Sequence, residues 1–124
     1  MIAVTLPWPD KHLSPNARVH HRVKAQYVKM AREVAFFETR QQCGVSLLTP
    51  DDNLSMLITA HPPDCRRRDL DNVLAMCKAY QDGICQALNI DDQQIRAVTV
   101  SWGDKRRGGK IEMQLASISV SHQN

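Results

Sequence analysis

Acidic side chains that could hold a metal ion lie in two short segments of the chain. The first is Asp69-Leu70-Asp71 and the second is the pair Asp91-Asp92. In an extended backbone, residues two apart point the same way, so Asp69 and Asp71 can converge while Leu70 faces the core. Carboxylate oxygens suit Mg²⁺ or Mn²⁺, which can activate water and stabilise an in-line displacement at phosphorus. The four aspartates are therefore predicted to form a metal site for phosphodiester cleavage.

A helix over residues 72–88 is predicted after the first acidic segment, with Asp71 as its N-cap and Asn89 as its stop. On a helical wheel one narrow stripe is apolar and is predicted to be buried: Val73, Cys77, Tyr80, Ile84 and Leu88. The opposite face carries Asp71, Lys78 and Asp82, with Lys78 about two turns beyond Asp71. Lys78 could therefore offset charge in a transition state. Alternatively, it forms only a solvated ion pair with Asp82.

Basic residues flank the acidic segments in two clusters. They are Arg66, Arg67 and Arg68 in the first cluster, and Lys105, Arg106, Arg107 and Lys110 in the second. The net charge is only +3, so the clustering is more informative than the total. Such clusters bind backbone phosphates, which gives an affinity that falls with salt and carries little sequence information. Both clusters are predicted to contact DNA.

Few other residues are candidates for contacting a DNA base. The loop over residues 10–21 contains His20 and His21, which are weak candidates for this role. Trp8 and Trp102 are interpreted as core residues in preference to base-stacking or interface residues.

Hydrophobic periodicity predicts four strands and two main helices. Period-two patterns mark strands at 2–8, 54–60, 98–102 and 111–115, the last two joined by a basic hairpin loop at 103–109. A helix is also predicted over residues 22–42, since apolar residues recur there every three to four positions: Val23, Tyr27, Met30, Ala31, Val34 and Phe37. The prediction is a single α/β domain over residues 1–124, a small mixed sheet packed with two helices in the order β-α-β-α-β-β.

Composition excludes several classes of protein. Hydrophobic residues make up 43% and charged residues 23% of the chain, which is close to a globular average and unlike a disordered or fibrous protein. No apolar run is long enough to span a bilayer, and no signal peptide is recognised at the N-terminus. The four cysteines have no zinc-site spacing and are interpreted as free thiols. A cytoplasmic protein without a small-molecule cofactor is expected.

The acidic segments resemble a known family, the RusA Holliday junction resolvases of bacteria and prophages. The resemblance rests on the string from Arg66 to Asn72, on Lys78 and Asp82, and on Asp91-Asp92 before a strand. Two further segments are similar, namely Pro7-Trp8-Pro9 at the end of the first strand and Ser14-Pro15-Asn16 in the loop. Two features differ from the best-known members: Lys78 lies three residues further from the Asp-Asn pair, and Asp10 replaces a second proline.

The resemblance implies a function and a set of site residues. It implies a homodimer that binds four-way DNA junctions and nicks two strands symmetrically in recombination and repair, with Mg²⁺ or Mn²⁺. Asp69, Asp71 and Asp92 would be metal ligands, and Lys78 would be the catalytic lysine. Two alternatives remain open: a non-catalytic protein that binds branched DNA, and a metal-dependent nuclease for other branched or RNA substrates.

Overall fold

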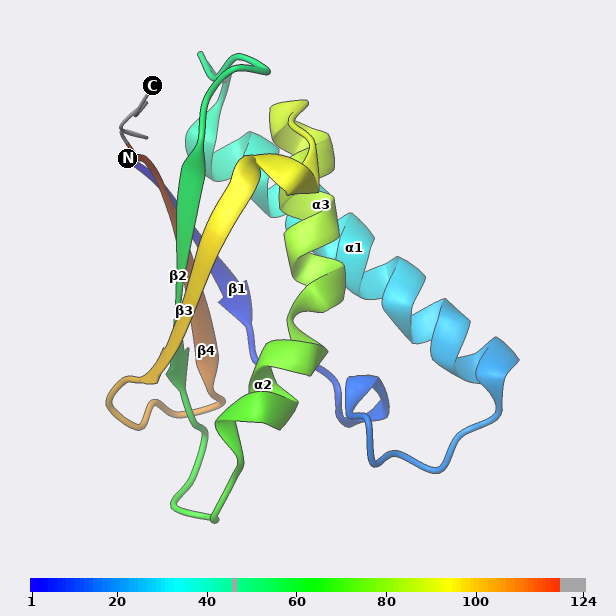
Figure 1. Ribbon diagram of the computed structural model, residues 1–124. Helices are drawn as coiled ribbons and strands as arrows, with labels where there is room; N and C mark the ends of the chain where they lie inside the picture. The colour runs from blue at the N-terminus through cyan, green and yellow to red at the C-terminus, as the bar shows by residue number, and fades with distance from the viewer. Residues whose placement is uncertain (46, 119–124) are drawn as a thin grey trace.

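The computed structural model describes residues 1–45 and 47–118, and Figure 1 shows a sheet with the helices on one side of it. The elements in chain order are β1 (Ile2–Pro7), the short 3₁₀ helix η1 (Lys11–Leu13), α1 (His21–Cys43), β2 (Leu54–His61), α2 (Leu70–Met76), α3 (Lys78–Leu88), η2 (Asp92–Gln94), β3 (Ile95–Trp102) and β4 (Lys110–Ser117). The strand order is β1-β4-β2-β3, with β2 and β3 parallel and the other pairs antiparallel. The predicted fold class, a small α/β fold with a mixed sheet, is confirmed.

The alternating sequence pattern produces one apolar face on three of the four strands. Its side chains are at most 3% exposed: Val4, Leu6, Leu54, Met56, Ile58, Ala60, Ile111, Met113 and Leu115. Burial of a large apolar side chain contributes roughly 1.5–3 kcal/mol, so this face supplies much of the folding free energy. The remaining strand, β3, lies at an edge of the sheet and is mostly exposed.

α1 and α3 approach each other closely at Gly83 of α3. A Cβ added there would lie 2.2 Å from the carbonyl oxygen of Arg32 and 2.9 Å from the Cβ of Ala35. Ala31 and Ala35 of α1 are buried in the same core. Small side chains therefore let the backbones of α1 and α3 approach each other over the sheet.

The outward face of α1 differs from the amphipathic pattern expected from the sequence. Met30 is 58% and Phe37 is 66% exposed, and Val23 and Val34 are exposed with them. The buried positions of this helix are Ala31, Ala35 and Thr39, because α3 approaches too closely for larger side chains. The predicted core face is therefore confirmed only at Ala31, which is buried, and at Tyr27, which packs against the core. The other four predicted residues form an exposed stripe.

The predicted helix over residues 72–88 is two helices, not one. α2 ends at Met76 and α3 begins at Lys78, and the backbone N–H of Cys77 between them donates to the carbonyl oxygens of both Val73 and Leu74. The prediction of one continuous helix is thus wrong. Its predicted stop at Asn89 is confirmed, since Asn89 adopts a left-handed conformation as the C-cap of α3.

Two smaller features complete the fold. All four cysteines are free thiols, and burial raises the pKa of Cys77 to about 12 and that of Cys85 to about 11. Both thiols therefore stay protonated and unreactive at neutral pH.

In the part of the chain that the structure describes, no helix has the length and apolar character needed to cross a bilayer.

We predict that Gly83→Ala destabilises the fold by about 1–3 kcal/mol, because the new methyl group must push α1 and α3 apart. Urea or thermal unfolding of the variant and the wild type measures the change. Gln86→Ala, at an exposed position of the same helix, serves as the control and should stay within about 0.5 kcal/mol of the wild type. Equal stability of Gly83→Ala and Gln86→Ala would contradict the close packing.

Candidate active site

The turn before α2 is folded around Arg68. Its Nη1 lies 2.9 Å from Asp64 Oδ1 and donates to the carbonyl oxygens of Asp64 and Arg66 at 3.3 and 3.2 Å. Its guanidinium lies over the Trp8 ring, 5.4 Å from the ring centre. Arg68 is the main reason that the pKa of Asp64 lies well below its usual range. The Arg68 side chain is 17% exposed and that of Arg66 is 80% exposed, so Arg68 belongs to the framework while Arg66 faces solvent.

Asp69 and Asp71 lie together at the start of α2. Asp69 is the N-cap, and its Oδ1 accepts a hydrogen bond from the backbone N–H of Asp71 at 3.3 Å. Asp71 lies exposed in the first turn, where the helix dipole favours a carboxylate. The prediction of Asp71 as N-cap is wrong by two residues, because the helix already begins at Leu70.

Lys78 connects α3 to the second acidic segment. Its Nζ donates to Asp82 Oδ1 at 3.1 Å and lies 3.6 Å from Asp92 Oδ2. The hydrogen bond to Asp82 is the main cause that raises the pKa of Lys78 above its ordinary value, with a further contribution from Asp92. The ammonium is therefore charged at neutral pH. Lys78 can supply positive charge to a reaction, but it cannot act as a general base there.

The two acids of the Asp91-Asp92 pair have different surroundings. Asp91 is the N-cap of η2. Its Oδ1 accepts a hydrogen bond from the backbone N–H of Gln93 at 2.9 Å, and the backbone N–H of Asp91 donates to the side-chain oxygen of Gln94 at 2.9 Å. The bond from Gln93 is the main reason that the pKa of Asp91 is lowered, and Asp92 contributes next. Asp91 is thus held in a cap, and Asp92 is the acid that faces Lys78.

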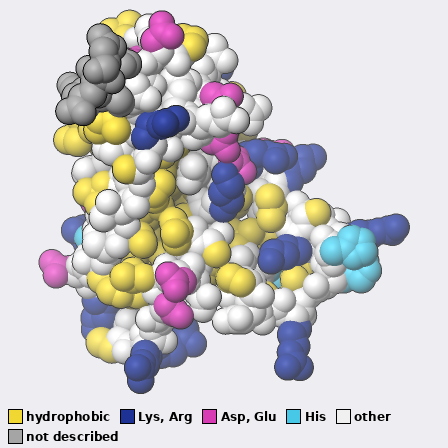
Figure 2. Space-filling model, in the orientation of Figure 1, with side chains coloured by type: hydrophobic (Ala, Val, Ile, Leu, Met, Phe, Trp, Pro, Cys, Tyr) yellow, Lys and Arg dark blue, Asp and Glu magenta, His cyan; other side chains and the backbone are white. Residues whose placement is uncertain are grey.

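The carboxylates of the two segments do not form one compact cluster. Among the residues that the structure describes, no group of three Asp, Glu, His or Cys side chains is placed to hold a metal ion. Figure 2 shows one group of acidic side chains over the start of α2 and a separate group around the turn between α3 and β3, besides others at the top and the left edge. Apolar surface and a basic side chain lie between them. The structure therefore brings Lys78, Asp82 and Asp92 together. Asp69 and Asp71 lie apart from that group, at the start of α2.

The two predicted basic clusters meet at one edge of the molecule. Lys105 Nζ lies 3.5 Å from Cys65 Sγ, and the backbone N–H of Arg106 donates to the carbonyl oxygen of Pro62 at 2.9 Å. The hairpin loop at 103–109 therefore packs beside the turn that carries the three arginines. This contact places the two basic clusters next to each other.

A buried histidine supports the base of that loop. His61 Nδ1 donates to the carbonyl oxygen of Asp104 at 2.8 Å, and its Nε2 lies 3.5 Å from Glu112 Oε1. A Cβ added at Gly103 would lie 2.4 Å from the His61 ring, so only glycine permits this approach. The start of the loop is thus fixed to β2 and β4.

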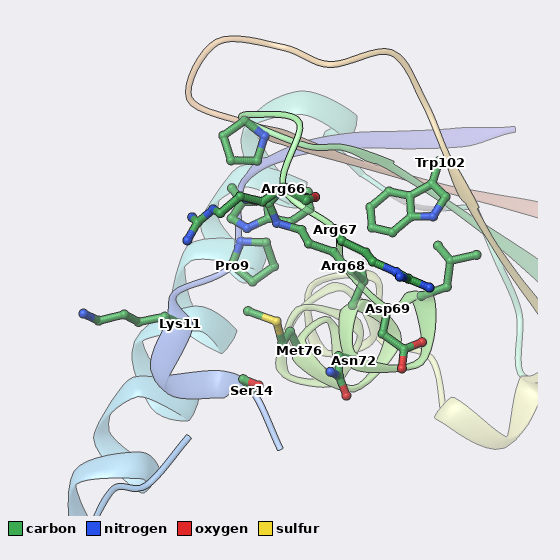
Figure 3. A pocket seen from close by; sticks show the side chains of 14 residues that line it. Pro9, Lys11, Ser14, Arg66, Arg67, Arg68, Asp69, Asn72, Met76 and Trp102 are labelled. Carbon is green, nitrogen blue, oxygen red and sulfur yellow. Dashed lines mark hydrogen bonds between the residues drawn. The ribbon is translucent and has the colours of Figure 1, made fainter. Parts of the chain in front are cut away.

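A cavity of about 950 Å³ lies between the basic turn, α2 and the end of β3. We call it the tryptophan pocket, and its lining residues are Trp8, Pro9, Lys11, Ser14, Pro63, Arg66, Arg67, Arg68, Asp69, Leu70, Asn72, Val73, Met76 and Trp102. Figure 3 shows Trp102 on the side of the pocket opposite Lys11, with the arginines between them and Asp69 on the same side as Trp102. A carboxylate of the first acidic segment is therefore part of the pocket wall.

The sequence pattern predicted the wrong environment for Trp102, the more exposed of the two tryptophans in this pocket. Trp102 is 40% exposed and does not belong to the core, whereas Trp8 is half-buried against it. Trp102 has the same period-two position as Val98 and Val100, and that pattern indicated a buried side chain. It ends an edge strand instead, beyond the cover of the helices. Its position at the end of the strand, just before Gly103, was the available signal.

Comparison with known proteins gives distant relatives. No family model matches the chain. It is 37% identical over its full length to an uncharacterised protein of Xylella fastidiosa, of which it covers 82%. It is 29% identical to the crossover junction endodeoxyribonuclease RusA of Escherichia coli, with 94% of both chains covered. It is 28% identical to the protein of the same name from Enterobacteria phage 82, with 93% of both covered. The chain is thus distantly similar, over nearly its whole length, to bacterial and phage proteins named RusA.

Proposed function

We propose that this chain is a RusA-like endonuclease that resolves four-way DNA junctions with Mg²⁺ or Mn²⁺, inside a bacterial or phage-infected cell. The observation that carries the proposal is the contact of Lys78 with Asp92, which joins a charged ammonium to the acidic turn before β3. The similarity to proteins named crossover junction endodeoxyribonuclease supports the choice of substrate. Four-way junctions present backbone phosphates on several sides, which suits a surface with two adjoining basic clusters.

The donor set fits a magnesium ion in its chemistry. Asp69, Asp71 and Asp92 are exposed carboxylates with hard oxygen atoms. We assign these three as the ligands and Asp91, which is held in its cap, as a neighbour that adds negative charge. A bound ion would offset the repulsion among the acids and activate a water beside the scissile phosphate. Because the start of α2 and the turn between α3 and β3 hold these ligands in two separate groups, one ion bound by all three requires the two segments to approach each other.

Lys78 has a charge-stabilising role in this proposal. Its raised pKa, caused first by Asp82, keeps the ammonium protonated throughout the neutral range. A compact positive charge near the reacting phosphate lowers the energy of a transition state in which negative charge develops. Asp82 then acts as a positioning residue, because it orients the ammonium from one helical turn away.

We predict that Asp71→Asn lowers junction cleavage by at least about 100-fold, because a neutral amide replaces a metal-binding carboxylate. Cleavage of labelled four-way, flap and linear DNA is measured with Mg²⁺, with Mn²⁺ and with chelator, and junction binding is measured alongside. Binding should persist in the variant. Asp51→Asn removes the same charge at an exposed turn, and this control should cut like the wild type.

The same assays separate the alternative functions. Junction binding without cutting in either metal would favour a non-catalytic protein that binds branched DNA. Efficient cutting of flaps, RNA or linear duplex in preference to four-way junctions would favour a nuclease of different specificity. Full activity of Asp71→Asn would remove this residue from the metal site.

We predict that Lys78→Met lowers the cleavage rate by about 100- to 1000-fold at saturating DNA, as expected for loss of a group that stabilises transition-state charge. Between pH 7 and 9 the wild-type rate should show no loss attributable to Lys78, because its pKa is raised above the ordinary lysine value. Single-turnover rates across this pH range test both points. Lys29→Met, at an exposed position of α1, is the matched control. A wild-type rate that fell with deprotonation of Lys78 in this range would contradict the assigned role.

A symmetric pair of nicks requires two active sites, so the proposal includes a homodimer. The exposed stripe of α1 is the surface we assign to it, because Met30 and Phe37 are 58% and 66% exposed on a helix that also presents Val23 and Val34. Exposed apolar patches of this kind are typical of interfaces between chains. A second copy that packs its own stripe against this one would bury both stripes.

We predict that Phe37→Glu converts a dimer to a monomer, because a carboxylate would be buried at the twofold contact. Light scattering after size-exclusion chromatography gives the mass, and the variant should still bind one arm of a junction while paired nicking falls. Leu57→Glu, at an exposed position on the sheet, controls for a general effect of the new charge. A wild-type monomer that still makes paired nicks would refute the dimer, and a dimeric Phe37→Glu variant would place its interface elsewhere.

A further inference from the structure

We infer that the tryptophan pocket binds an unpaired DNA base, stacked on Trp102, at the branch point of the substrate. The inference rests on the proposed function in one respect only, namely that the unpaired base is supplied by a DNA junction. The pocket itself is defined by its geometry: an exposed indole ring at one side, cations along its wall and a carboxylate of the first acidic segment at its edge.

The two tryptophans of the pocket are not equivalent. The ring of Trp8 lies beneath the guanidinium of Arg68, and Gly109 approaches it closely enough that a Cβ there would lie 2.8 Å from Trp8 Cβ. Trp8 is therefore already covered. Trp102 has no aromatic or cationic partner among residues 1–45 and 47–118, and 40% of its surface is exposed. Its ring is the one available for stacking.

The charges around the pocket fit a nucleotide better than an uncharged ligand. Arg67 makes no ion pair or hydrogen bond within the described part of the chain, and Arg66 is 80% exposed despite a weak contact with Asp64. Lys11 lies on the opposite side. Arginine and lysine at the rim bind backbone phosphates, while an aromatic ring accepts the face of any base. The combination of stacking ring and cationic rim is typical of proteins that hold unpaired nucleotides.

The position of the pocket connects base binding to the acidic site. Asp69 lines the pocket and caps α2, so a base stacked on Trp102 has its own backbone close to the first acidic segment. A base inside a duplex cannot enter such a pocket without being unstacked, whereas a base at a branch point has lost part of its stacking already. The pocket would therefore favour branched over linear DNA.

A binding cycle with abasic substitutions tests the inference. Four-way junctions that lack one base at successive positions around the branch point are titrated, in chelator, against wild type, Trp102→Ala and Val98→Ala. At one position the missing base should weaken wild-type binding roughly tenfold, the size expected for loss of one stacked base. The same abasic change should not affect Trp102→Ala, because its stacking partner is already gone. Val98→Ala, an exposed residue of the same strand, should respond like the wild type.

A second measurement uses no junction. Addition of an eight-nucleotide oligothymidylate should quench part of the tryptophan emission of the wild type, and Trp102→Phe should lose that quenching. Identical responses of wild type and Trp102→Ala at every abasic position, together with no quenching, would overturn the inference. Normal junction cleavage with that result would leave the proposed function intact. Conversely, quenching by the oligonucleotide without any junction binding or cleavage would refute the proposed function while the base pocket stands.

Discussion

The change of chain direction at Cys77 is the constraint on which the arrangement of the candidate site depends. The direction of α3 is set by packing, because Gly83 seats it against α1 and the Tyr80 hydroxyl donates to the carbonyl oxygen of Pro7 at 2.9 Å. α2 instead follows the arginine turn. With the buried Cys77 as the joint, Asp69 and Lys78 lie on separate helices. The distance between the acidic groups is thus fixed by core packing and not by the acids themselves.

This joint accounts for the electrostatics on either side of it. Lys78 is the first residue of α3, so its side chain can reach both Asp82 on the next turn and Asp92 beyond the end of the helix. Opposite charges at these distances stabilise one another while exposed to solvent, by a few tenths of a kcal/mol to about 1 kcal/mol. Within the described residues, no ion pair joins either carboxylate at the start of α2 to a cation. Their mutual repulsion is what a divalent ion would relieve.

The sequence predicted the strands and the buried stripe of α2 and α3 because both follow from local periodicity. That stripe runs from Val73 to Leu88 and survives the break, since a short interruption at Cys77 leaves the apolar residues on the sheet side. The break itself was not predictable from a helical wheel, which assumes one straight axis. The exposure of Phe37 and Trp102 was missed for a related reason. Whether an apolar residue is buried depends on which partner reaches it, and periodicity carries no information about partners.

The arginine turn shows why a run of identical residues does not imply identical functions. Arg68 is fixed by Asp64 and by the Trp8 ring, so its charge is largely neutralised within the fold before any ligand arrives. A phosphate would have to displace those contacts to bind it. Arg66 and Arg67 have fewer internal contacts and remain available. Fewer arginines are therefore available to a ligand than the three that the sequence contains. Arg68 holds the turn in the shape that leaves Arg66 and Arg67 exposed.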